Sequence, residues 1–146
     1  MNKGQSLFEV VVALAISALI IITLVSVVGN SIKNATFSKN KTLAANYAQE
    51  ATEWLRGQRD LNIKTFMTKA LIPTWCLNNL SWTIPGACSG SSQITGTPFT
   101  RNANFVITTP IPGKTLVEAS VIVSWTDSGG NHQVKSATSF SDWRQR

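Results

Sequence analysis

The sequence predicts an α+β protein in which a long N-terminal helix packs on a small antiparallel sheet. The N-terminal region contains a nearly continuous apolar run, followed by an amphipathic segment with helical spacing. The C-terminal region instead places apolar residues at every second position in three successive segments, which is the period of a strand. A helix with one apolar stripe needs a partner layer, and the sheet provides it.

The helix begins with a stretch that is apolar on all sides. The run from Val10 to Val28 contains only three polar residues, which are Ser17, Thr23 and Ser26. With the two apolar residues just before Glu9, it reaches the roughly 20 residues that a helix needs to cross a bilayer. A soluble core of this size cannot bury such a helix on every side, so we expect a transmembrane segment.

The residues around the start of the run indicate what kind of membrane segment it is. A secretory signal has a basic start and a small-residue cleavage site after its apolar stretch. Here Lys3 is the only basic residue before the run, and no Ala-x-Ala site follows the run. Instead Gly4 precedes it, and a carboxylate, Glu9, stands five residues after that glycine. The segment KGQSLFE (residues 3–9) resembles the processing site of the type IV pilin and pseudopilin family.

The resemblance implies a defined processing and assembly route. In the family a membrane enzyme, the prepilin peptidase, cuts after the glycine and usually methylates the new amine. The leader would be residues 1–4, and the mature chain would begin at Gln5, where the family most often has an apolar residue. Glu9 would be the fifth mature residue, which in the family meets the free N-terminal amine of a neighbouring subunit. We therefore expect Gly4 and Gln5 to be the processing site and Glu9 to act in filament assembly.

After the leader, the chain is predicted to form one long helix with two halves, followed by a globular head. Residues 5–28 are the predicted transmembrane half of the helix, and residues 29–58 its amphipathic half, with helix propensity lowered at Gly29 and Asn30. Gly57 is the expected C-cap. The amphipathic stripe is expected to pack on the chain's own sheet, and its end nearer the membrane against neighbouring helices. The stripe consists of Phe37, Ala44, Ala48, Ala51 and Leu55.

Residues 59–146 are the predicted globular head. A short helix is expected from Asp60, as its cap, to Leu71, with Pro73 after it and Leu61, Phe66, Met67 and Leu71 buried. Cys76 and Cys88 fit no zinc pattern, and in an exported domain we expect them to form a disulfide. The polar segment 89–97 is a predicted surface loop.

Three strands are predicted after this loop. The first places Phe99, Arg101, Ala103, Phe105 and Ile107 on one face, with Arg101 as the discordant member. Residues 110–113 are proline- and glycine-rich and predict a turn. The second strand alternates Val117, Ala119, Val121, Val123 and Trp125 with mostly polar residues, and residues 127–131 form a hairpin connection to a third strand ending near Phe140. The end of the chain, residues 121–144, resembles the last hairpin of minor pilins and pseudopilins.

No residue pattern predicts a catalytic site, a metal site or a cofactor. The single histidine, His132, lies beside the hairpin turn, where a solvated position is expected. Trp75 and Trp82 are most simply packing residues, although an adhesive surface on the loop is an alternative. The net charge of +6 is dispersed without a run of like charges, so no specific nucleic acid is indicated.

The leading hypothesis is therefore a structural filament subunit and not an enzyme. The resemblance implies a minor pilin or pseudopilin of a type IV pilus or a type II secretion filament. Its partners would be the prepilin peptidase, other pilin subunits and the cytoplasmic membrane, with the head outside the cytoplasm and the filament extracellular or periplasmic. The alternative is an uncleaved single-pass anchor that displays a binding domain outside the cell. Motility, adhesion, DNA uptake and secretion are all open as roles.

Overall fold

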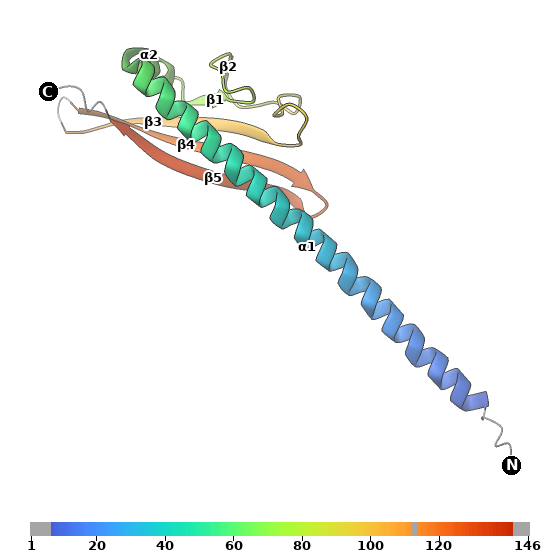
Figure 1. Ribbon diagram of the computed structural model, residues 1–146. Coiled ribbons are helices and arrows are strands. Elements are labelled where there is room, and N and C mark those ends of the chain that lie inside the picture. Colours follow the sequence, from blue (N-terminus) through green and yellow to red (C-terminus); the bar gives the residue numbers. More distant parts are fainter. Residues whose placement is uncertain (1–6, 112–113, 142–146) are drawn as a thin grey trace. The chain divides into compact units, whose positions relative to one another are not determined.

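The computed structural model describes residues 7–111 and 114–141, and it has the predicted α+β fold (Figure 1). The chain forms helices α1 (Leu7–Leu61) and α2 (Ile63–Ala70) and strands β1 (Thr74–Cys76), β2 (Ile84–Pro85), β3 (Thr100–Ile111), β4 (Lys114–Asp127) and β5 (Gly130–Ser141). The strands form one antiparallel sheet in the order β2-β1-β3-β4-β5. The chain divides into two compact units, residues 1–40 and 41–146, which we describe separately.

Helix α1 is longer than the sequence predicted. Gly29 and Asn30 are both helical, because one glycine lowers helix stability by only about 1 kcal/mol, which does not interrupt a helix of 55 residues. The predicted C-cap at Gly57 is wrong, since the helix continues to Leu61. Asn62 then begins α2, and its side chain accepts a hydrogen bond from the Thr65 backbone N–H at 3.0 Å.

The later start of α2 changes which residues it buries. Phe66 and Ala70 are buried and Met67 is partly buried. The predicted burial of Leu61 and Leu71 is wrong, because these residues are 80% and 71% exposed. Both residues lie outside the eight-residue helix α2. Because α2 is capped by Asn62 and not by Asp60, its buried face differs from the expected one.

The three long strands confirm the predicted alternation. The odd-numbered residues of β4 from Val117 to Trp125 belong to one hydrophobic core, and the even-numbered residues of β4 lie on the opposite face of the sheet. β4 is the central long strand and pairs with β5 from Leu116↔Ser141 to Asp127↔Gly130. The hairpin turn requires Gly130, whose φ of 116° is strained for any residue with a side chain. Residues 112–113 of the predicted turn, and residues 142–144 of the segment that resembles the last pilin hairpin, lie outside the described residues.

Strands β1 and β2 were not predicted. They contain three and two residues, which is too short for a period of two to be recognised. β1 pairs with β3 through Thr74↔Asn104, Trp75↔Ala103 and Cys76↔Asn102. The first part of the cysteine loop is therefore an extension of the sheet.

One face of the sheet is covered by helices within the unit 41–146. Four α1 residues of the predicted stripe pack there, Ala44, Ala48, Ala51 and Leu55, together with Thr52, which was not predicted. Phe66 of α2 reaches the same face, where its ring lies 6.2 Å from that of Phe105 and 5.1 Å from that of Phe140. Figure 1 shows the green part of α1 running across the sheet. The head is thus a two-layer structure with helices on one face.

Candidate functional site

The first half of α1 is exposed throughout its described residues. Every residue from Leu7 to Lys39 is exposed, including Phe37, the stripe residue nearest the membrane, for which packing against neighbouring helices was expected. An 18-residue window of the helix has a mean hydropathy of 3.0, and none of it is buried. By length and composition this segment could span a membrane, a test that signal sequences near an N-terminus also pass.

Glu9 lies in the first turn of this apolar helix. It is the only charged residue between Leu7 and Ile32, and its side chain is exposed within the chain. The two predicted processing residues, Gly4 and Gln5, lie outside the described residues, so processing stays a prediction. Of the other predicted site residues, Glu9 belongs to the first unit and both cysteines belong to the second, and each unit is described by itself.

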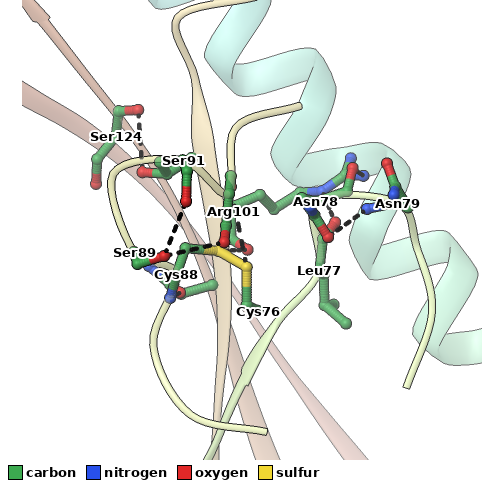
Figure 2. The surroundings of a disulfide bond; sticks show 12 residues. Cys76, Leu77, Asn78, Asn79, Cys88, Ser89, Ser91, Arg101 and Ser124 are labelled. Carbon is green, nitrogen blue, oxygen red and sulfur yellow. Dashed lines mark hydrogen bonds between the residues drawn. A yellow bond between two sulfur atoms is a disulfide. The ribbon is translucent and has the colours of Figure 1, made fainter. Parts of the chain in front are cut away.

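The predicted disulfide between Cys76 and Cys88 is present (Figure 2). Cys76 ends β1 and is fully buried, whereas Cys88 lies in the loop that returns to β3. The Cys88 backbone N–H donates a hydrogen bond to Oδ1 of Asn102, at 2.7 Å. A cross-link closing a loop of this size adds about 3 kcal/mol to the free energy of unfolding in the chain-entropy model.

Beside the disulfide, Arg101 is the most deeply buried charged side chain among the described residues, with 2% exposure. Its Nε donates to the carbonyl oxygen of Leu77 at 2.9 Å, and its Nη2 to that of Asn78 at 3.4 Å. Its Nη1 donates to the carbonyl oxygen of Tyr47 at 3.1 Å and to Oε2 of Glu50 at 2.7 Å. The sequence signal for this residue was a charged side chain on the otherwise apolar face of β3. This discordance was visible in the sequence, but no role for Arg101 was predicted from it.

The two tryptophans of the cysteine loop belong to the core. Trp75 is 3% exposed, and its Nε1 donates to the carbonyl oxygen of Lys69 at 2.9 Å. The Trp82 ring lies 4.9 Å from that of Trp54 and 5.2 Å from that of Trp75, and its Nε1 donates to Oε1 of Gln58 at 3.1 Å. The simpler interpretation of these residues as packing residues is confirmed, and an adhesive surface built on Trp75 is excluded.

At the β4–β5 turn, Asp127 and His132 form a polar pair that the sequence did not predict. Nε2 of His132 lies 2.9 Å from Oδ1 of Asp127, and the backbone N–H of Gly129 donates to the same oxygen at 2.7 Å. The Gly129 hydrogen bond, followed by that of His132, lowers the pKa of Asp127 below its ordinary value. These bonds brace the turn. Among the described residues, no group of three His, Cys, Asp or Glu side chains could hold a metal ion.

The face of the sheet away from the helices carries a shallow hollow of about 280 Å³. Its floor is formed by small residues of neighbouring strands, Ser120 and Ala137, which are register partners. Glu118 and Lys135 line it two positions away from that floor, in opposite directions along the strands. The arrangement offers polar contacts to a partner but no nucleophile paired with a base.

Comparison with known proteins gives no further assignment. The chain matches no protein-family model, no curated protein and no solved structure.

Proposed function

We propose that this chain is a structural subunit, a minor pilin or pseudopilin, of a type IV pilus or a type II secretion filament. The prepilin peptidase cuts between Gly4 and Gln5, and the mature subunits then assemble by parallel packing of their N-terminal helices. The cytoplasmic membrane holds the subunit, with its head outside the cytoplasm, until it enters an extracellular or periplasmic filament.

The observation that supports the proposal most strongly is the combination of the KGQSLFE segment with the helix that follows it. The helix offers an apolar surface on all sides over residues 10–28 and buries none of it in its own unit. Such a surface needs lipid or other apolar helices around it. A filament core supplies the second environment after the membrane has supplied the first.

Within this proposal Glu9 has a specific task. An acidic residue in an apolar helix opposes membrane insertion, by roughly 2.5–3.5 kcal/mol at the bilayer centre and less near the ends. In the filament its carboxylate would meet the new amine of Gln5 in a neighbouring subunit. Because an unpaired charge in an apolar core is strongly penalised, the pairing would fix the axial position of each incoming subunit.

The second candidate is an uncleaved single-pass anchor that displays the head as a binding domain. The hollow lined by Glu118 and Lys135, on the face of the sheet away from the helices, favours this candidate, because a displayed binding domain needs a polar contact surface. The two candidates differ at the N-terminus, since an anchor has no need for Gly4 or Glu9.

Intact mass spectrometry of the membrane-extracted chain separates the two candidates. In cells that express a prepilin peptidase, we expect the mass of a chain beginning at Gln5, with or without a methyl group. Gly4→Val places a branched side chain at the cut and should leave the full-length mass, whereas the matched leader variant Asn2→Val should be processed normally. A wild-type chain that keeps residues 1–4 beside an active peptidase would favour the anchor.

A further inference from the structure

Arg101 joins three segments of the head that are far apart in the sequence. It projects from β3, and its guanidinium binds two carbonyl oxygens of the cysteine loop and two oxygens of α1. Figure 2 shows its side chain extending from the strand past the disulfide to the backbone of Leu77 and Asn78. The oxygens on α1 come from Tyr47 and Glu50, one turn apart on the segment of the helix that packs on the sheet.

A guanidinium with 2% exposure depends on all of these acceptors. A buried charge that loses part of its hydrogen-bonding shell is destabilised much more than an exposed one, because water does not replace the lost partner. Removing the loop oxygens would therefore weaken the site at which Arg101 holds α1. The reverse also applies, since coupling between two contacts of one group is reciprocal.

The loop oxygens are held in place through the disulfide. Leu77 and Asn78 directly follow Cys76, and Cys88 brings the other end of the loop back to β3, where its Sγ lies 3.2 Å from the Arg101 carbonyl oxygen. Apart from the cross-link, this region is tied to the sheet by the short pairings of β1 and β2 and by two further hydrogen bonds. The Leu77 N–H donates to the Arg101 carbonyl oxygen at 2.8 Å, and the Cys88 N–H donates to Oδ1 of Asn102 at 2.7 Å. Pairings of two or three residues open readily when a covalent link is removed.

We propose that Arg101 makes the docking of α1 on the sheet depend on the redox state of Cys76 and Cys88. With the disulfide formed, the loop presents its two oxygens, Arg101 is fully bound, and residues 41–61 of α1 are held on the sheet. With the cysteines reduced, the loop opens locally, Arg101 loses those oxygens, and the helix segment detaches more often. The inference concerns the head alone and goes beyond the proposed function, whose failure would not affect it.

The chemical step is an ordinary thiol–disulfide exchange. Each cysteine thiol loses one proton and one electron, and the two sulfurs form a bond. The oxidant is the disulfide form of a thiol–disulfide oxidoreductase, which accepts both protons and both electrons and is reduced to its dithiol form. In an exported chain the docking of α1 would therefore follow oxidation.

Amide hydrogen exchange of the full chain in detergent micelles tests the proposal. The oxidised protein is compared with protein reduced by dithiothreitol, which is itself oxidised to its cyclic disulfide, and with the double variant Cys76→Ser/Cys88→Ser. We expect peptides covering residues 74–80 and 43–57 to exchange roughly tenfold faster without the disulfide, the middle of the range for coupled neighbours. Peptides from the central part of β4 (117–125) should not change, which separates local opening from global unfolding.

Variants of Arg101 and of its partner Glu50 decide whether Arg101 transmits the redox state of the cysteines to α1. In Arg101→Met, residues 43–57 should exchange at one rate whether or not the disulfide is present, while residues 74–80 still respond to reduction. If that variant does not fold, Glu50→Leu removes the exposed α1 partner and should reduce the response of residues 43–57. Arg56→Met and Glu53→Leu change an exposed ion pair on the same helix and should behave as the wild type.

Two results would overturn the proposal. One is an α1 segment whose exchange in the wild type does not respond to reduction. The other is a response that persists unchanged in Arg101→Met or, where that variant fails to fold, in Glu50→Leu.

Discussion

The two halves of α1 are one helix with two different chemistries. In residues 7–39 every side chain is exposed within the chain, and in the first 26 of these residues only Glu9 is charged. In residues 41–61 charged residues alternate with a narrow buried stripe, in which Ala44, Ala51 and Leu55 are fully buried. Helical backbone forms in both halves, so the backbone conformation does not distinguish them.

The difference shows where each half finds its stabilising partner. The second half uses small residues that let its backbone approach the sheet closely, and it is completed by its own chain. The first half is apolar on all sides and is completed only by an environment outside the chain. Substitutions in the first half should therefore affect membrane insertion and, under the proposed function, filament assembly. Substitutions in the second half should affect the stability of the head.

The largest expected effect comes from Glu9→Leu. Under the proposed function, this variant should insert in the membrane and be cleaved as well as the wild type, or better, yet be nearly absent from filaments, because the new amine of each neighbour loses its partner. Immunoblots of sheared filament fractions, normalised to membrane-bound subunit, measure the effect. Ser17→Leu is the matched control, since it also replaces a polar residue by leucine in the same apolar helix without removing a charge.

The filament fraction gives a direct answer on Glu9. Normal amounts of the Glu9→Leu chain there would mean that the carboxylate only tolerates its position, with its charge reaching the headgroups. Loss of the Ser17→Leu chain as well would show that assembly is sensitive to polarity in general and not to this carboxylate.

An intermediate effect is expected from Ala51→Leu. Ala51 is fully buried between α1 and the sheet, so a larger side chain forces the two layers apart, which costs about 1–3 kcal/mol. Ala35→Leu makes the same change in the first half, where alanine is exposed, and should leave the head unaffected. All five tryptophans lie beyond residue 50, so denaturant unfolding followed by tryptophan fluorescence reports on the head alone. Equal unfolding midpoints for the two variants would contradict the described packing of the second half.

Periodicity was sufficient for the long elements of the fold. The alternation around Val121 and the spacing of Ala44, Ala48 and Ala51 each extend over enough residues to define a face. The short strands β1 and β2 depend on pairing with residues far along the chain, so no local pattern reveals them. The end of α1 was misplaced because a glycine near the end of a stripe is a frequent C-cap but not an obligatory one.

The features of the candidate site also differ in whether the sequence could predict them. The disulfide could be predicted because only one pairing of two cysteines exists. The role of Arg101 could not be predicted, because its four acceptors lie on two segments far from it in the sequence, and three of them are backbone oxygens, which leave no trace in the side-chain sequence. The resemblance to a prepilin processing site depends on a local pattern of side chains, so it could be proposed from the sequence alone.

The smallest expected effect, and the one that decides between sequence and structure, comes from Gly57→Ala. A C-cap glycine in the left-handed region would lose stability on this change, whereas a glycine inside a helix should gain about 0.5–1 kcal/mol. In the structure Gly57 is helical, has no positive φ, and leaves open space where a Cβ would stand. We therefore expect a higher unfolding midpoint in the tryptophan fluorescence assay. Gly130→Ala, at a φ of 116°, should lower the midpoint, and Gly29→Ala in the first half should not move it. A lower midpoint for Gly57→Ala would place the end of α1 at residue 57, as the sequence pattern suggested.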